Sequence, residues 1–235
     1  MPPIGEDNEV LQNPHIFLDE IMRQEEDNEI IRLTMDIRNG KSLPLYKGND
    51  VMIVRAGDMD PGMYLWADQI IVGKNDTRRS INSQMRQVLF DVEDEKPIEG
   101  DKVICLRNSW ETINEVGDVL VNGLSGTISN INYNNYNPFL QPMMLADFIP
   151  DDYDELDEEF SFGDLYFRQL NMDYKLLTTG EPTVNEKNFK RFPKGIKPLA
   201  FDYGYCITCH KSQGSEYDKV LVFEEHLKDS QHARW

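Results

Sequence analysis

The chain has 235 residues, of which 40% are hydrophobic and 10% aromatic, so it can bury a core and is not a disordered chain. No apolar run approaches the roughly 20 residues that span a bilayer, and the N-terminal sequence MPPIGEDNEV is not an export signal. Three cysteines are too few for a disulfide framework, so a reducing cytoplasm is expected. The formal net charge of -18 argues against a nucleic-acid partner unless basic residues gather locally.

The charge is spread unevenly along the chain. Residues 147–160, DFIPDDYDELDEEF, contain eight carboxylates and no basic residue. We interpret this acidic loop as a solvated insertion, with docking onto a basic partner as the alternative. Basic residues gather elsewhere, at Arg78, Arg79 and Arg86 and again at Lys187, Lys190, Arg191 and Lys194. A local basic channel therefore stays compatible with the negative net charge.

In chain order, the first predicted elements are helices and one strand. Residues 14–24 and 28–39 are predicted helices, the second ending at Gly40 as its C-cap. DQIIVG, 68–73, is a short apolar run suited to a buried strand, and 77–90 follow as a helix. A strand followed directly by a helix indicates an α/β layer.

A small β unit is predicted next. Residues 99–110 are expected to form a strand and 119–133 a hairpin, with turn signals at Asn122, Gly123 and Gly126. Residues 164–177 alternate enough to be a strand. The chain therefore reads as an α/β domain interrupted by a β insertion over roughly residues 98–198.

The pattern then returns to buried strands, predicted at 199–208 and 219–227, with a tight turn or single helical turn between them. This region contains CITCHKSQGSEYD, 206–218. Its start fits three chemical readings: a haem-attachment motif, a thioredoxin-type redox pair, or the beginning of a zinc site through Cys206, Cys209 and His210. We prefer a fourth, in which both cysteines are small core or near-core residues, because a strand would point them to opposite faces.

The polar half of this stretch, HKSQGSE, gathers short donors around one glycine straight after a buried strand. Such a strand end presents backbone N–H groups and polar side chains that can hold phosphate, on a nucleotide or on a nucleic-acid backbone. A plain polar turn between two strands fits these residues equally well. The residues alone leave both interpretations open.

Residues 208–218, TCHKSQGSEYD, closely resemble motif V of the RecD-like and Dda-like branch of superfamily 1 DNA helicases, which moves 5′ to 3′ on single-stranded DNA. Further segments are similar in the right order. PPIGE, 2–6, resembles the tail of motif III, and LDEIMRQ, 18–24, resembles motif IV. Residues 70–86 resemble the strand and helix before the family's insertion, which usually end in a Leu-Asn or Ile-Asn pair. GDKVICLRN, 100–108, with VNGLSGTI resembles the SH3-like insertion.

The resemblance implies an α/β fold: a RecA-like, P-loop-NTPase-type helicase domain 2A with a small inserted SH3-like β domain, 2B. The expected ranges are 1–97 for the first part of domain 2A, 98–198 for the insertion with the acidic loop 147–160, and 199–235 for the second part of domain 2A with motif V.

The resemblance also implies roles for individual residues. Arg23 would reach the γ-phosphate, where a guanidinium stabilises charge on the transferred phosphoryl group. Without the resemblance, Arg23 would be read as a surface ion-pairing residue of a helix. The expected nucleotide-binding residues are Gln24, Gln213, Gly214 and Glu216, and the expected DNA-binding residues are Thr208, His210, Lys211 and Ser212.

Several parts of the family's catalytic machinery are missing from the sequence. No G-x-x-x-x-G-K-[ST] phosphate loop occurs, no Asp-Glu pair follows an apolar strand in the expected place, and no motif VI arginine is present. We therefore expect ATP and Mg²⁺ to bind only in an intact parent with a further N-terminal RecA-type domain. This chain alone is expected to be inactive, and no metal site of its own is expected.

The leading hypothesis is thus part of an ATP-dependent 5′-to-3′ DNA helicase, acting on single-stranded DNA and DNA forks in replication, recombination or repair, with no membrane partner. A bacterial or phage-infected cytoplasm would suit it. The alternative is a stand-alone single-stranded-DNA-binding or regulatory module that has lost the motor. Metal or haem binding through the two cysteines and His210 is a third hypothesis, which predicts zinc or a haem spectrum in the purified protein.

Overall fold

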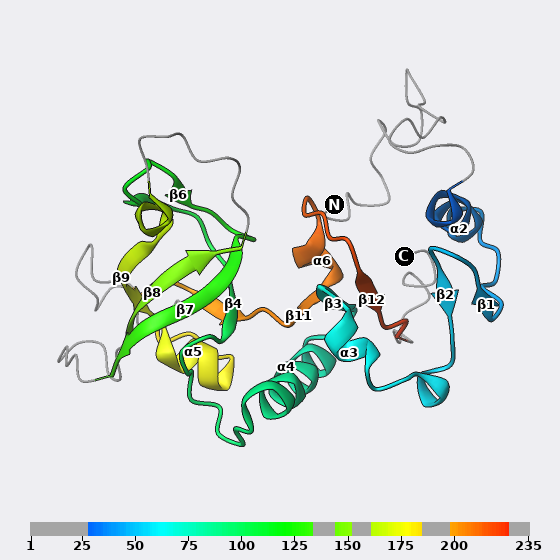
Figure 1. Ribbon diagram of the computed structural model, residues 1–235, viewed down its shortest axis with the longest axis horizontal. Helices are drawn as coiled ribbons and strands as arrows, with labels where there is room; N and C mark the ends of the chain where they lie inside the picture. The colour runs from blue at the N-terminus through cyan, green and yellow to red at the C-terminus, as the bar shows by residue number, and fades with distance from the viewer. Residues whose placement is uncertain (1–27, 134–143, 152–160, 185–197, 226–235) are drawn as a thin grey trace. The chain divides into compact units, whose positions relative to one another are not determined.

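The computed structural model describes residues 28–133, 144–151, 161–184 and 198–225 (Figure 1). The chain divides into two compact units, one of residues 1–66 with 223–235 and the other of residues 67–222. The helix predicted at 14–24 lies outside the described residues. Across the described ranges, no helix has the length and apolar character needed to span a membrane.

The first unit begins with helix α2, Glu29–Arg38, which confirms the helix predicted at 28–39. The side chain of Asn28 caps its start by accepting from the Ile30 N–H at 2.8 Å. Gly40 follows the helix with a φ of 71°, a left-handed conformation that glycine adopts without a side-chain clash. The predicted end signal at Gly40 therefore directly follows the C-cap residue, Asn39, whereas the N-cap role of Asn28 was not predicted.

The carboxylate of Glu29 fixes a hairpin against this helix. Strand β1, Tyr46–Lys47, pairs with β2, Met52–Ile53. Glu29 accepts hydrogen bonds from the Asp50 N–H at 2.9 Å and from the Tyr46 hydroxyl at 2.8 Å. The bond from the Asp50 N–H has the largest effect and lowers the pKa of Glu29, and the bond from the Tyr46 hydroxyl lowers it further.

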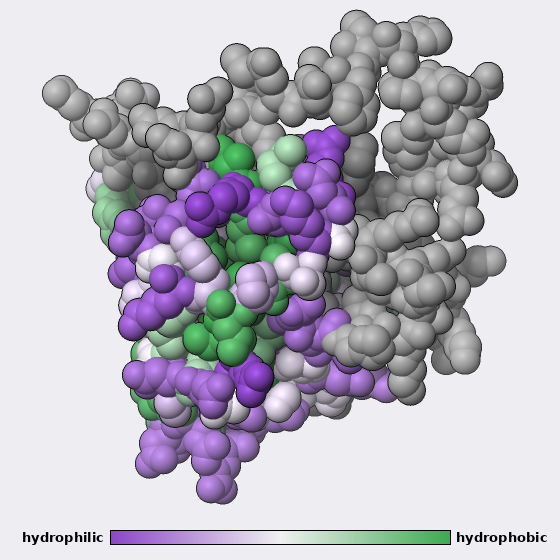
Figure 2. Space-filling model, turned by 90° about the vertical axis from the view of Figure 1, so that its right-hand side faces the viewer, coloured by the Kyte–Doolittle hydropathy of each residue, from purple (hydrophilic) through white to green (hydrophobic). Residues whose placement is uncertain are grey.

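The remainder of this unit consists of the 3₁₀ turn η1, Ala56–Asp58, and the short helix α3, Met63–Trp66. Figure 2 shows apolar side chains gathered among hydrophilic ones on the face that it draws. The exposed apolar residues of the unit's helix and hairpin region include Ile30, Ile37, Leu45, Met52 and Val54.

The second unit contains the α/β layer that the sequence predicts. Strands β11, Cys206–Thr208, β3, Gln69–Val72, and β12, Val220–Val222, form a parallel sheet in that order. Helix α4, Asn75–Phe90, follows β3 directly and packs against β3 and β11. The predicted α/β class is confirmed, and a parallel sheet with a covering helix is consistent with a RecA-like domain.

The second unit also contains a five-stranded antiparallel sheet and a small two-stranded sheet. We call these two sheets together the β unit. The strand order of the five-stranded sheet is β10, β4, β7, β8, β9. These strands are Phe201–Tyr203, Lys102–Cys105, Ser125–Asn132, Met144–Pro150 and Phe167–Met172. The small sheet pairs β5, Ser109–Ile113, with β6, Val119–Leu120.

Three phenylalanines form the centre of the β unit. The ring of Phe148 lies 5.1 Å from that of Phe201 and 6.1 Å from that of Phe167, between ring centroids. All three side chains are almost completely buried. Full burial of aromatic side chains of this size dominates the energetics of a small core.

The prediction of a hairpin at 119–133 is wrong. Strand β6 pairs with β5, whereas β7 pairs with β4 and β8, so the turn at Asn122 and Gly123 links two different sheets. Gly126 lies inside β7, where an added Cβ would collide with the Ile149 carbonyl oxygen. This glycine therefore permits close packing of strands instead of marking a turn.

Two predicted strands are broken in the structure. The strand predicted at 164–177 is replaced by three elements: the end of the 3₁₀ turn η2, Phe162–Leu165, then β9, and then the start of helix α5, Tyr174–Thr179. Asp173 caps α5 by accepting from the Leu176 N–H at 3.1 Å. Residues 199–208 divide into β10 and β11, which belong to different sheets. The break falls at Gly204, where a side chain would press against the backbone of Val103 at about 3.1 Å.

The acidic loop predicted at 147–160 begins within a strand. Asp147 is buried in β8, and its carboxylate accepts from the Asn130 side chain at 2.7 Å and from the Gln169 N–H at 2.8 Å. The prediction of a solvated loop is therefore wrong at its start, because Phe148 and its apolar neighbours continue the strand. Residues 152–160 lie outside the described part of the chain.

Strand β10 is the most C-terminal strand of the five-stranded sheet in sequence. It ends at Tyr203, beyond the boundary that was expected for the insertion at residue 198. The three expected domain ranges and the SH3-like assignment of the β unit stay predictions.

Candidate nucleic-acid interface

The motif V segment, residues 208–218, leaves the parallel sheet at its carboxyl edge. Thr208 ends β11 beside Val72, the last residue of β3. A single helical turn, α6, Cys209–Ser212, follows, as one of the sequence predictions expects. After it, Gly214 has a φ of 92° with open space around its Cα. The carboxyl edge of a parallel sheet is where such folds hold ligands.

The structure places the four predicted DNA-binding residues at the end of β11 and on α6. Thr208 is half-buried at the strand end, His210 is exposed, and Lys211 and Ser212 are half-buried. The Ser212 hydroxyl donates to the Cys209 carbonyl at 2.9 Å and so closes the turn, leaving its oxygen able to accept. These side chains form one short polar edge.

The predicted nucleotide-binding residues are only partly placed. Gln213, Gly214 and Glu216 are exposed on the loop that follows α6. Arg23 and Gln24 lie outside the described residues. Their roles stay predictions.

The cysteines differ from one another. Cys206 is buried within β11, as predicted, but Cys209 is exposed on α6, so its assignment to the core is wrong. Its sulfur lies 3.4 Å from the Val72 carbonyl oxygen. The two residues fall on different elements because the strand ends between them. Within the described ranges, no group of three or more His, Cys, Asp or Glu side chains could hold a metal ion.

Lys211 contacts the β unit. Its ammonium donates a hydrogen bond of 2.7 Å to the side-chain oxygen of Asn122, in the turn between β6 and β7. Burial lowers the pKa of Lys211, and the nearby Arg78 cation acts in the same direction. The motif V segment is therefore joined to a turn that is distant in the sequence.

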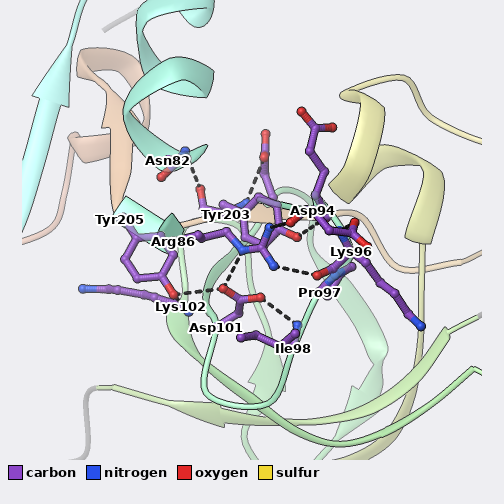
Figure 3. Close-up of polar contacts among 12 residues, drawn as sticks. Asn82, Arg86, Asp94, Lys96, Pro97, Ile98, Asp101, Lys102, Tyr203 and Tyr205 are labelled. Carbon is purple, nitrogen blue, oxygen red and sulfur yellow. Dashed lines mark hydrogen bonds and ion pairs between the residues drawn. The ribbon is translucent and has the colours of Figure 1, made fainter. Parts of the chain in front are cut away.

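Asn82 of α4 supports the strand that carries the motif V segment (Figure 3). Its amide nitrogen donates to the carbonyls of Tyr203 at 3.2 Å and Cys206 at 3.0 Å, and its oxygen accepts from the Cys206 N–H at 2.8 Å. The side chain is buried, and all three partners are backbone groups. One amide thus satisfies the backbone where β10 ends and β11 begins.

Arg86 and Asp101 form a buried ion pair between α4 and the β unit (Figure 3). The Arg86 Nε lies 2.8 Å from the Asp101 Oδ1, with side-chain exposures of 3% and 0%. Arg86 also donates to the carbonyls of Asp94 at 2.7 Å and Lys96 at 2.6 Å, and the Tyr205 hydroxyl donates to Asp101 at 3.0 Å. Burial is the largest single effect on Arg86 and disfavours its charged form, but the bond to Asp101 and the interactions with Asp101, Tyr203 and Tyr205 together outweigh burial and raise the pKa of Arg86.

A second ion pair joins α4 to β10. The Arg78 Nη1 lies 2.5 Å from the Asp202 Oδ2. Burial raises the pKa of Asp202 and outweighs the opposing effect of the Arg78 cation. Two charged contacts and one amide therefore hold the β unit and the motif V strand to the same helix.

The sequence did not identify Asn82, Arg86, Asp101 or Asn122 as supporting residues. Two of them have a signal within the resemblance: Ile81 and Asn82 are an Ile-Asn pair, and Asp101 belongs to GDKVICLRN, 100–108, the segment that resembles the SH3-like insertion. The contacts of Asn122 and Arg86 have no local signal, because their partners lie on other elements.

Known proteins were compared with the chain as a whole. The family model for the UvrD-like helicase C-terminal domain matches residues 203–235, which include the motif V segment. The resemblance to superfamily 1 helicases predicted from the sequence is confirmed by this match. No curated protein matches the chain.

Solved structures similar to this chain include two Pif1 proteins. Unliganded Pif1 from a Bacteroides species is 14% identical, with 65% of this chain and 45% of that chain covered and a TM-score of 0.33. Pif1 helicase from Candida albicans is 16% identical, with 86% and 48% covered and a TM-score of 0.40. The chain spans about half the length of these structures.

Proposed function

We propose that this chain is the DNA-gripping part of an ATP-dependent 5′-to-3′ DNA helicase of the RecD-like branch of superfamily 1B. The observation that carries the proposal is the contiguous segment TCHKSQGSEYD at 208–218, which lies inside the matched helicase region and on the carboxyl edge of a parallel sheet. The proposed partners are single-stranded DNA and the DNA fork, in replication, recombination or repair in the cytoplasm of a bacterial or phage-infected cell.

In this proposal, α6 binds the sugar-phosphate backbone. His210 and Lys211 supply donors and charge, while Thr208 and Ser212 supply hydroxyl groups of the kind that bind phosphate oxygens. A grip through backbone phosphates carries no base specificity, which suits a protein that moves along any sequence. The net charge of -18 does not oppose it, because the contact needs only a local cationic edge.

The loop after α6 would face the nucleotide. This loop, with Gln213, Gly214 and Glu216, follows the DNA-binding turn α6 directly. A movement of the loop on nucleotide binding can therefore be transmitted to α6. Arg23 and Gln24 are assigned to the nucleotide from the resemblance alone. ATP and Mg²⁺ would be held between this chain and a further RecA-type domain, which supplies the phosphate loop that this sequence lacks.

Because these groups are missing, we expect the chain of 235 residues to hydrolyse no ATP by itself. The measurement is phosphate release by the purified chain with and without single-stranded DNA, beside a His210→Ala variant. DNA-stimulated release that disappears in the variant contradicts this expectation.

DNA binding by Lys211 is tested by fluorescence anisotropy with a fluorescein-labelled oligodeoxythymidine. Lys211→Ala is expected to weaken binding about five- to tenfold at low salt and to reduce the slope of log K against log salt by about 0.7, because one phosphate contact is lost. Lys175→Ala is the matched control, since Lys175, on α5, pairs with the exposed Glu181. Equal binding by the two variants, or no binding by the unaltered chain, contradicts the proposed function.

A further inference from the structure

The hydrogen bond between Lys211 and Asn122 is the contact from which a further role can be inferred. It joins α6, at the end of the parallel sheet, to the turn that connects the two sheets of the β unit. The two elements belong to the same compact unit of the chain, residues 67–222. A lysine proposed to bind DNA therefore has its position set by a residue outside the motif V segment.

The turn that holds Lys211 is itself fixed by the β unit. The Asn122 N–H donates to the side-chain oxygen of Asn108 at 2.7 Å, and the Gly123 N–H donates to the Cys105 carbonyl at 2.8 Å. Gly123 has a φ of 95°, which suits the third position of a tight turn and favours glycine there. With its backbone held in this way, Asn122 presents its side-chain amide to Lys211.

The chemistry of this contact leaves the lysine able to bind an anion. An ammonium group has three donors, and Asn122 accepts one of them. The amide oxygen is neutral, so it orients the ammonium without cancelling its charge. Because Lys211 is half-buried and has lost part of its hydration, a phosphate oxygen would replace water at the remaining donors.

We propose that Asn122 is a positioning residue that aims the Lys211 ammonium at a phosphate of single-stranded DNA, so that the turn of residues 121–124 and α6 form one DNA-binding edge. The inference rests on the proposed function, and adds to it a residue and a part of the β unit that the motif V segment does not contain. A neutral acceptor is required at this position, because a carboxylate would pair with the ammonium and repel the phosphate.

The test is Asn122→Asp in the full chain, measured with the same labelled oligodeoxythymidine at several salt concentrations. The carboxylate keeps the size of the side chain but neutralises Lys211, so affinity is expected to fall about five- to tenfold at low salt and the salt slope by about 0.7. Asn108→Asp is the matched control. It adds the same charge beside the same turn, and its carboxylate still accepts from the Asn122 N–H. Its affinity is expected to change less than twofold.

A double variant shows whether Asn122 acts through Lys211. In a Lys211→Gln background, Asn122→Asp is expected to cause no further loss, because the cation that it neutralises is already gone. Equal unfolding midpoints of all variants by circular dichroism show that the fold is intact. A merely structural role for Asn122 would change these midpoints and leave the salt slope unaltered.

The outcomes separate this inference from the proposed function. If Lys211→Gln weakens binding but Asn122→Asp does not, the positioning role of Asn122 is overturned and the proposed function stands. The same holds if Asn122→Asp and Asn108→Asp lose equal affinity, since the effect is then one of general charge. If Lys211→Gln binds the oligonucleotide as the unaltered chain does, the proposed function fails at this residue and the inference fails with it.

Discussion

Replacing Asp101 by alanine is expected to lower the free energy of unfolding by about 3–5 kcal/mol. The Asp101 side chain is fully buried and accepts from Arg86, from the Tyr205 hydroxyl and from the Ile98 N–H. Its removal leaves the buried guanidinium of Arg86 without an anionic partner, and this uncompensated charge is the main cost. The β unit would then lose its principal charged contact with α4.

Urea denaturation followed by circular dichroism measures this loss. Lys175→Ala is the control, because it breaks an exposed pair that solvent already screens, and little change is expected. The double variant Arg86→Met with Asp101→Leu is expected to recover most of the loss, since no charge then stays buried and unpaired. A loss below about 1 kcal/mol for Asp101→Ala contradicts the importance given to this ion pair.

Asn82→Ala is expected to lower the free energy of unfolding by about 2–4 kcal/mol, because three buried backbone groups lose their hydrogen-bond partner. The same change is expected to loosen β11, the strand that leads into the motif V segment. The Asn82 amide is the side chain that satisfies both the N–H and the carbonyl of Cys206.

Amide hydrogen exchange measures the local part of this effect. Faster exchange is expected at Cys206 and Thr208 in Asn82→Ala, beyond the global change found by urea denaturation. Gln84→Ala on the same helix is the control, because Gln84 is exposed and bonds only weakly to Ser80 at 3.4 Å. Equal effects of the two variants would show that Asn82 contributes no more than an ordinary helix residue.

Local sequence pattern predicted the elements whose structure is decided locally. The apolar run before α4 and the helical spacing within it identified β3 and α4, and α2 lies where a helix ending at Gly40 was predicted. The pairing of β6 and β7 was mispredicted because a turn signal at Asn122 and Gly123 specifies a reversal of the chain but not the partner of each strand. Here β7 finds its partners in β4 and β8, through contacts that no local pattern describes.

The same distinction applies to the candidate site. A contiguous motif predicted Thr208, His210, Lys211 and Ser212 as DNA-binding residues, and the structure places them at the end of β11 and on α6. The residues that hold this turn in place were not predicted, because each acts across a long stretch of sequence. Asn122 reaches Lys211 only after the β unit has folded, and Asn82 reaches Cys206 only when α4 packs on β11.

Photochemical cross-linking to single-stranded DNA tests the central claim most directly. The full chain would be irradiated with an oligodeoxythymidine that carries 4-thiothymidine, and the cross-linked peptides mapped by mass spectrometry. Cross-links are expected within residues 208–214 and in the turn of residues 121–124, which share the Lys211 contact. Cross-links confined to other parts of the chain, or none at DNA concentrations that saturate binding, would contradict it.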